Sequence, residues 1–338
     1  MPEMKNASTV KIVRFHKTGA ADVLQIEEMP LPEPGPGEVR LRVKAIGLNR
    51  AEVLFRMGQY LVAPKLPSKI GYEASGVVEA VGEGVDASLV GQTRSTVPAF
   101  MADAYGVYGE VAIVPVDAVA EYPASLTPEE GTSIWMQYLT AYGALVHYGK
   151  VTKGDFVLIT AASSSVGIAA IEIVKAEGAV SIATTRTSAK KDELLKLGAD
   201  FVIATEEEDL VARVKEITGG KGARVIFDPI GGPGLEKLAE VAAASGTIFE
   251  YGALAMEATP FPLLTVLSKH LTIKGYTLFE VVGGAETRGV AERYVFDRLR
   301  TGEFKPRIDK VFKGLESIVE AQKYMESNVQ IGKIVVTV

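Results

Sequence analysis

The first 125 residues alternate between short runs of β-branched or aromatic residues and clusters of turn residues. This pattern is typical of strands separated by tight connections. The clearest runs lie at 10–15, 39–45, 74–81 and 111–115. A proline-rich connection at 30–36 follows the first run. We therefore predict an irregular β domain at the start of the chain.

A helical pattern begins near residue 126 and continues to about 146. Thr127, Pro128 and Glu130 have the spacing of an N-cap, a first-turn proline and the third helical position of a capping box. These residues predict the point at which the helix starts.

From residue 154 onward, apolar runs alternate with helical patterns. The runs are apolar throughout, as in strands that are buried on both faces. They lie at 156–160, 180–184, 201–204, 225–228, 246–251 and 271–277. Between the first two, apolar residues recur at helical spacing from Val166 to Val174. Thr205 and Glu208 predict the cap of a later helix. The alternation predicts an α/β domain with a doubly wound, mostly parallel sheet.

The last part of the chain changes character again. We expect a helix near 291–299, then a strand and a helix after Pro306, and a final strand at 333–338. A β-type ending suggests that the C-terminus returns to the first domain.

The turn after the first buried strand has the form of a dinucleotide-binding fingerprint. In the G-x-G-x-x-G pattern, glycines allow a tight turn and a close approach of the backbone to a pyrophosphate. Ala162, Ser164 and Gly167 occupy the three glycine positions, so only the third glycine is present. The helix N-terminus still offers N–H groups and partial positive charge. The expected cofactor contacts are Ala162, Ser163, Ser164, Ser165, Val166 and Gly167. A turn that serves only packing is the alternative.

The residue that follows the second strand indicates which dinucleotide is bound. In NAD sites, an acidic residue about 20 positions after the glycines binds the ribose 2′-hydroxyl. Here the corresponding position is Arg186, preceded by Thr185 and followed by Lys190 and Lys191. Because cations bind a 2′-phosphate whereas a carboxylate would repel it, NADPH is favoured over NADH. A solvated start of a helix is the alternative interpretation of these basic residues.

Composition and charge exclude several classes of function. The 338 residues carry a net charge of −6 and contain no cysteine. An acidic chain without a basic tract lacks the charge pattern of a nucleic-acid-binding protein. Without cysteine there is no disulfide framework, thiolate nucleophile or Cys-bound zinc. No uninterrupted apolar stretch is long enough to span a bilayer. With no leader-like pattern at its start, we expect a cytoplasmic protein that binds neither membranes nor nucleic acid.

Several short motifs, in order along nearly the whole chain, carry a resemblance to a known family. These motifs lie at residues 35–39, 45–49, 76–82, 140–142 and 331–335. The chain resembles the zinc-independent quinone-oxidoreductase and enoyl-reductase branch of the medium-chain dehydrogenase/reductase superfamily. The resemblance implies a GroES-like catalytic domain at 1–125 and 283–338 and a Rossmann domain at 126–282. It also implies that the two domains bind NADPH together.

The positions of the catalytic zinc ligands in this superfamily are changed in the present chain. By motif, those positions correspond to Asn49, Tyr72 and Met136. None of these is a good zinc ligand, and Glu73 alone does not make a metal site. We therefore expect hydride transfer in which hydrogen bonds, rather than a metal, stabilise the developing oxyanion.

Two residues are candidates for contact with the reacting carbonyl group. Tyr60 matches the catalytic tyrosine of the family's 2-enoyl reductases, and a neutral phenol can donate a hydrogen bond or a proton. Tyr60 as a pocket wall without a catalytic role is the alternative. Asn49 resembles the family residue near the nicotinamide, and a buried core amide is its alternative. The resemblance adds Tyr72, Phe100 and Tyr105 to the expected substrate pocket.

The resemblance also implies cofactor contacts elsewhere in the chain. These are Thr140, Tyr251, Gly252, Leu278, Phe279 and Lys333. The leading hypothesis is an NADPH-dependent reductase of quinones or α,β-unsaturated carbonyls. A non-catalytic, crystallin-like NADPH-binding protein and a zinc alcohol dehydrogenase with unusual ligands are the alternatives. Relatives of this kind form homodimers or homotetramers, so we expect one of these assemblies.

Overall fold

A computed structural model describes residues 8–338. These residues form two compact units, one of residues up to 136 together with 306–338 and the other of residues 137–305. Both boundaries therefore lie later in the chain than the expected boundaries after residues 125 and 282. Residues 1–7 lie outside the described range. The expectation that the chain starts without a leader-like pattern rests partly on these residues.

The first unit contains a three-stranded and a seven-stranded sheet. The smaller sheet has the order β2-β1-β4, with bounds Leu24–Pro30, Thr9–Phe15 and Ser68–Lys69. The larger has the order β15-β16-β3-β5-β6-β8, and β7 also pairs with β3. Its strands are β3 (Glu38–Gly47), β5 (Glu73–Val81), β6 (Thr93–Thr96), β7 (Val111–Pro115), β8 (Val119–Ala120), β15 (Ile308–Lys313) and β16 (Lys333–Thr337). The predicted β-rich domain is thereby confirmed.

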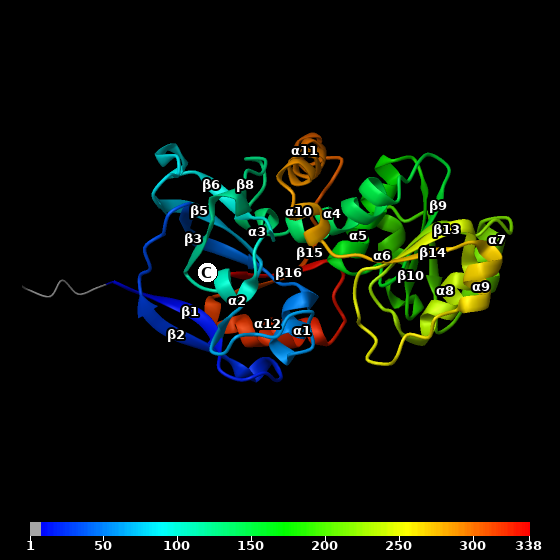
Figure 1. Ribbon diagram of the computed structural model, residues 1–338, viewed down its shortest axis with the longest axis horizontal. Helices are drawn as coiled ribbons and strands as arrows, with labels where there is room; N and C mark the ends of the chain where they lie inside the picture. Colours follow the sequence, from blue (N-terminus) through cyan, green and yellow to red (C-terminus); the bar gives the residue numbers. More distant parts are fainter. Residues whose placement is uncertain (1–7) are drawn as a thin grey trace, which may run out of the picture. The chain divides into compact units, whose positions relative to one another are not determined.

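The C-terminal strand belongs to this first unit. β16 pairs antiparallel with β3, with Val335 opposite Gly47. Figure 1 shows the red end of the chain among the blue strands of the N-terminal half. Ile334, Val335 and Val336 are completely buried, so the strand is part of the core. The predicted return of the C-terminus is confirmed.

The helices of the first unit are short. They are α1 (Arg50–Met57), α2 (Ala102–Tyr105), α3 (Pro128–Gly131) and α12 (Ile318–Glu326), with 3₁₀ turns at Ala21–Val23, Ala87–Leu89, Val116–Ala118 and Leu315–Ser317. Helices α1 and α12 pack against each other although about 260 residues separate them (Figure 1). The hydrophobic pattern did not predict α1.

The helix predicted at 126–146 is interrupted. Its capping box is confirmed, because the Thr127 side chain accepts from the backbone N–H of Glu130 and the Glu130 side chain accepts from that of Thr127. Helix α3 ends at Gly131, however, and α4 (Trp135–Tyr142) starts anew before a π-helical segment, Gly143–Tyr148. Ser133 donates its hydroxyl to the Glu129 carbonyl, a local bond of the kind that competes with a regular helix.

The second unit is built on a six-stranded sheet with the order β11-β10-β9-β12-β13-β14. Its strands are β9 (Phe156–Ile159), β10 (Val180–Thr185), β11 (Phe201–Ala204), β12 (Ala223–Asp228), β13 (Ala242–Glu250) and β14 (Thr272–Gly275). Every neighbouring pair is parallel. This is the strand order of a doubly wound Rossmann fold, so the predicted fold class is confirmed.

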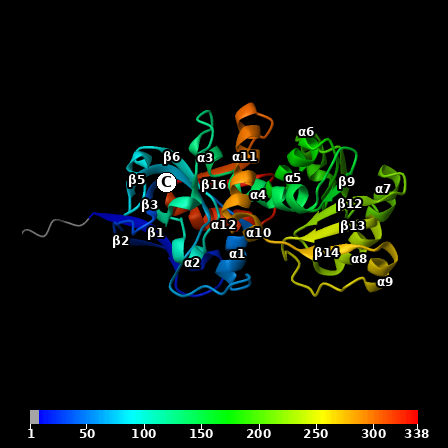
Figure 2. The ribbon, with the colours of Figure 1, turned by 45° about the horizontal axis from the view of Figure 1, so that its top comes forward.

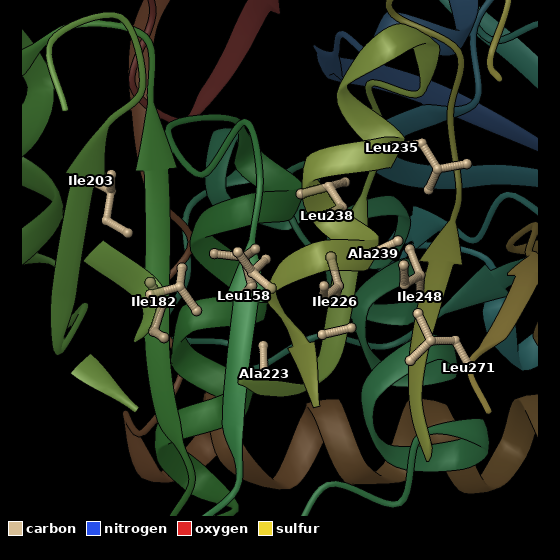
Figure 3. Packing of buried hydrophobic residues seen from close by; sticks show 13 residues of the cluster. Leu158, Ile182, Ile203, Ala223, Ile226, Leu235, Leu238, Ala239, Ile248 and Leu271 are labelled. Atoms are coloured by element: carbon tan, nitrogen blue, oxygen red, sulfur yellow. The ribbon is translucent and has the colours of Figure 1, made fainter. Parts of the chain in front are cut away.

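Helices cover both faces of this sheet. Figure 2 shows α5 (Ser165–Ala176) and α6 (Lys191–Lys196) on one side, and α8 (Leu235–Val241) and α9 (Leu263–Lys269) on the other. Figure 3 shows the buried cluster that joins the strands to α8, including Leu158, Ile226 and Leu238. Burial on both faces explains why the strands are apolar throughout.

Two further helices correct expectations from the sequence. Helix α7 (Leu210–Ile217) begins after Asp209, whose side chain accepts from the Ala212 N–H, so the predicted cap at Thr205 is wrong. The hydroxyl of Thr205 donates instead to the Thr185 carbonyl. Helix α11 (Ala285–Thr301) follows α10 (Phe279–Val282). Tyr294 of α11 packs on Tyr142 of the second unit, which explains the later boundary.

Within residues 8–338, none of the helices combines the length and the apolar character that crossing a membrane would require.

Candidate active site

The turn between β9 and α5 is shaped by one glycine and one capping serine. The Ser164 side chain accepts from the Gly167 N–H at 3.0 Å, which starts α5. A Cβ on Gly167 would lie 2.6 Å from the Ala162 Cα atom, so only glycine fits without a shift of the backbone. Ala162 itself is completely buried, and its N–H donates to the Thr184 carbonyl. The small residues that replace the first two glycines are thus compatible with the tight turn of the fingerprint.

A basic side chain reaches this turn from the end of β10. The Lys190 ammonium lies 3.3 Å from the Ser163 hydroxyl. Arg186 is exposed directly after β10, and Thr185 is half-buried at the end of that strand. Lys191, by contrast, pairs with Glu208 at 2.9 Å. The basic cluster expected from the sequence is therefore divided, with Lys190 at the turn and Lys191 held by a carboxylate.

Two carboxyl groups that the sequence analysis missed lie at the ends of β12 and β13. Asp228 is buried, and its carboxylate accepts from the Thr160 hydroxyl and from the Gly231 N–H. Burial and the neighbouring Asp228 raise the pKa of Glu250 to about 8. Both residues lie at the ends of buried strands. Because ligands of such sheets bind at the carboxyl ends of the strands, this position in the sequence could have predicted them.

The other expected cofactor contacts of the second unit lie at or near strand ends and on α4. Tyr251 stacks on Phe227 with ring centroids 3.9 Å apart, and burial raises the pKa of its hydroxyl. A Cβ on Gly252 would approach the Pro229 carbonyl oxygen to 2.7 Å. Thr140 on α4 is buried, as is Leu278, while Phe279 at the start of α10 is half-buried.

In the first unit, the side chain of Asn49 is bonded entirely to protein groups. Its carbonyl oxygen accepts from the Lys333 ammonium at 2.6 Å. Its amide nitrogen lies 3.3 Å from both the Gly47 carbonyl and the Glu52 carboxylate. This arrangement has the character of a buried core amide, which was the alternative to a substrate contact.

Lys333 and Glu73 form a buried ion pair beside Asn49. Both side chains are essentially inaccessible to solvent. The second carboxylate oxygen of Glu73 accepts from the backbone N–H of Met136 at 2.8 Å. Lys333, expected at the cofactor, is thus bonded within the first unit. Residues 8–338 contain no group of three or more His, Cys, Asp or Glu side chains arranged to hold a metal ion.

A second buried carboxylate, Glu52, organises the start of α1. It accepts from the backbone N–H groups of Asn49 at 2.8 Å and Tyr72 at 2.9 Å, and from the Tyr108 hydroxyl. Burial raises the pKa of Glu52 despite these donors. Neither Glu52 nor Tyr108 was predicted from the sequence. The spacing Asn49-x-x-Glu52 is that of a capping box and could have identified Glu52.

The aromatic residues predicted to line the substrate pocket lie together. The ring of Tyr72 packs on Phe100 at 6.0 Å, and Phe100 packs on Tyr105 at 6.1 Å. Tyr105 donates its hydroxyl to Glu38. Burial raises the pKa of Tyr72, and the proximity of Tyr60 adds to this effect. The pKa of Tyr60 is itself raised, by burial and then by Glu52. Both phenols therefore remain protonated hydrogen-bond donors at neutral pH.

Comparison with known proteins identifies the family. Two family models match, the alcohol dehydrogenase GroES-like domain at residues 35–124 and the zinc-binding dehydrogenase at 165–295. A 2-haloacrylate reductase from a Burkholderia species is 31% identical over 327 residues, which cover 95% of this chain and 97% of the relative. The chain belongs to the medium-chain dehydrogenase/reductase superfamily, in its quinone-oxidoreductase branch.

Other members of the superfamily match over similar lengths. The synaptic vesicle membrane protein VAT-1 homolog of Rattus norvegicus is 30% identical over 334 residues, covering 94% of this chain and 81% of the relative. The crystal structure of Escherichia coli quinone oxidoreductase complexed with NADPH superposes with a TM-score of 0.89 at 30% identity. That superposition covers 97% of this chain and 100% of the bacterial one. The resemblance drawn from the sequence motifs is thereby confirmed.

Proposed function

We propose that this protein is an NADPH-dependent oxidoreductase that transfers hydride to a quinone or an α,β-unsaturated carbonyl compound without a metal. The observation that carries the proposal is the turn after β9, where Gly167 leaves space that a Cβ would fill and Lys190 reaches Ser163. A tight turn at a helix N-terminus with an added cation suits a phosphorylated dinucleotide. The E. coli relative crystallised with NADPH supports the same cofactor.

The charges around this turn support NADPH over NADH. Glu208 offsets the charge of Lys191, and Lys190 and the exposed Arg186 supply the cations for a 2′-phosphate. Lys190 is a point charge, whereas Arg186 offers a planar fork that can bind phosphate through two hydrogen bonds. We propose Arg186 as the residue that distinguishes the two dinucleotides.

The chemistry of the first unit supports a carbonyl acceptor. Bound NADPH would supply the hydride, and the acceptor's oxygen would then carry the developing negative charge. Tyr60 and Tyr72 hold protons at neutral pH, because burial raises the pKa of both. Tyr60 donates a hydrogen bond to that oxygen and passes its proton to the enolate in the proposed reaction. Asn49, with its amide bonded inside the protein, holds the start of α1 in place.

The proposal is tested by measuring NADPH consumption with quinones, enones and enoyl thioesters. We expect turnover with at least one class, and a Tyr60→Phe variant with at least about a hundredfold lower kcat for enones, the lower end of the range of general acid catalysis. Full turnover of enones by this variant would remove the acid role of Tyr60. Tight NADPH binding without any turnover would favour the non-catalytic alternative. Stoichiometric zinc in elemental analysis would favour a zinc alcohol dehydrogenase.

We also propose that the chain assembles as a homodimer or homotetramer through the edge of the six-stranded sheet. β14 is the last strand of that sheet, and α9 directly precedes it. This region carries exposed apolar side chains, among which Leu264 is 80% exposed. Apolar patches of this kind mark interaction sites in soluble proteins. Light scattering on a Leu264→Glu variant should show a smaller species than the parent protein. An unchanged mass would contradict this interface.

A further inference from the structure

The ammonium group of Lys333 is buried between three chain segments of the first unit. Lys333 starts β16, Asn49 precedes α1, and Glu73 starts β5. The ammonium donates to the Asn49 carbonyl oxygen at 2.6 Å and pairs with the Glu73 carboxylate. The exposed fraction of the lysine side chain is 0%, and that of the glutamate is 1%. A charge so deeply buried is stable only when it is paired and hydrogen-bonded.

The neighbouring strand is built to accommodate this lysine. β16 pairs with β3, and Val335 lies opposite Gly47 at the end of β3. A Cβ on Gly47 would lie 2.9 Å from the Lys333 Cε atom and 2.1 Å from the Thr132 carbonyl oxygen. Glycine at this position therefore makes room both for the lysine stem and for the backbone before α4. The glycine at position 47 is therefore part of the packing that buries Lys333.

The contacts of Lys333 connect it to the proposed catalytic surface. Asn49, held by Lys333, donates its backbone N–H to Glu52, and Glu52 also accepts from the backbone N–H of Tyr72. Glu52 lies close enough to Tyr60 to raise the pKa of that phenol. On the other side, Glu73 accepts from the N–H of Met136. One ammonium thus fixes the two residues that border the start of α1 and the start of β5.

We propose that Lys333 is a positioning residue whose buried ammonium holds Asn49 and Glu73, and through them the Tyr60 and Tyr72 surface, instead of binding the cofactor. The family resemblance suggested a cofactor contact for this lysine. To reach a diphosphate outside the core, however, the fully buried ammonium would have to move out and strand the Glu73 carboxylate there. Such an uncompensated buried charge is strongly destabilising. This inference rests on the proposed oxidoreductase function.

The test compares Lys333→Met, Glu73→Gln and the double variant of both. A Lys313→Met variant, at an exposed position of β15, serves as the matched control. For each variant, kcat and KM are measured with the best acceptor, and the dissociation constant of NADPH is measured by titration calorimetry. The double variant removes both buried charges, so we expect it to fold even if Lys333→Met alone does not.

We expect kcat to fall at least tenfold in Lys333→Met and to recover at least partly in the double variant. KM for the acceptor and the NADPH dissociation constant should stay within about threefold of the parent in the double variant, as they should in the control. An NADPH dissociation constant raised more than tenfold in both Lys333→Met and the double variant would overturn the proposal, as would an unchanged kcat in Lys333→Met.

The two claims can fail separately. If the parent enzyme turns over none of the acceptors, the proposed function fails. The positioning role is then decided by binding and stability alone. A loss of unfolding free energy in Lys333→Met that the double variant restores, with NADPH affinity preserved, would support the buried pair. A loss of NADPH affinity in the double variant would contradict it.

Discussion

A buried carboxyl group on α5 makes a quantitative prediction about stability. Glu172 accepts from the Tyr138 hydroxyl and from the Lys305 backbone N–H at 3.2 Å. The ring of Tyr138 stacks on Phe304 with centroids 4.9 Å apart, which packs the start and the end of the second unit around this carboxyl. Burial raises the pKa of Glu172 to about 7, and the two donors only partly oppose this effect.

The size of the effect follows from linkage between protonation and folding. In the unfolded chain Glu172 has its ordinary pKa of 4.5, so between this pH and about 7 the folded protein holds a proton that the unfolded chain has lost. Stability therefore falls as the pH rises through this interval. The difference in pKa corresponds to about 3 kcal/mol in the free energy of unfolding once both states are ionised.

Glu172→Gln imitates the protonated side chain and should remove this dependence. Its amide can donate to the Tyr138 oxygen while its carbonyl accepts from Lys305. In urea denaturation at pH 8, we expect the variant to be more stable than the parent by up to about 3 kcal/mol. At pH 5 the advantage should shrink to about 1 kcal/mol or less. Glu236→Gln, at an exposed position of α8, is the control and should follow the parent at both pH values. A variant less stable than the parent at pH 8, or a gain in stability that does not change with pH, would show that Glu172 does not hold the proton in the folded protein.

Three further variants test other parts of the structure. Gly167→Ala should weaken NADPH binding in calorimetry and lower the free energy of unfolding by about 1–3 kcal/mol, because its Cβ would overlap the Ala162 backbone. Unchanged affinity would contradict the proposal that this turn binds the cofactor. Arg186→Ser should raise the NADPH dissociation constant and leave that of NADH unchanged, and a parallel loss for both would contradict a 2′-phosphate contact. Glu250→Gln should show a smaller fall in melting temperature from pH 5 to about pH 8 than the parent, because the folded parent holds a proton on Glu250 there that the unfolded chain has lost. The same decline in both proteins would count against the carboxyl pair with Asp228.

The fold could be predicted where a strand or helix carries its own signal. The six parallel strands were found because burial on both faces makes each run apolar from end to end. The capping box at Thr127 was found because all its parts lie within four residues. The return of β16 to the first unit followed from its β-type pattern. By contrast, the break between α3 and α4 depends on packing, and the pattern does not show it.

The candidate site was harder to predict because its parts are distant in the sequence. Lys333 and Glu73 are 260 positions apart, and neither segment indicates that the other will bury its charge. Motif resemblance assigned the lysine to the cofactor, whereas the contacts assign it to the core of the first unit. Glu52 is the exception, because its spacing from Asn49 is a local signal of a capping box. Asp228 and Glu250 approach each other only because β12 and β13 are neighbours in the sheet.

The proposed reaction is hydride transfer from NADPH to a conjugated carbonyl compound. It is tested most directly by incubating the protein with an enone and NADPH that carries deuterium at the transferable C4 position, and locating the label by mass spectrometry and NMR. We expect one deuterium at the β-carbon of the saturated product, with the α-hydrogen taken from solvent. A product without deuterium, or bound NADPH that is never oxidised by any acceptor, would contradict it.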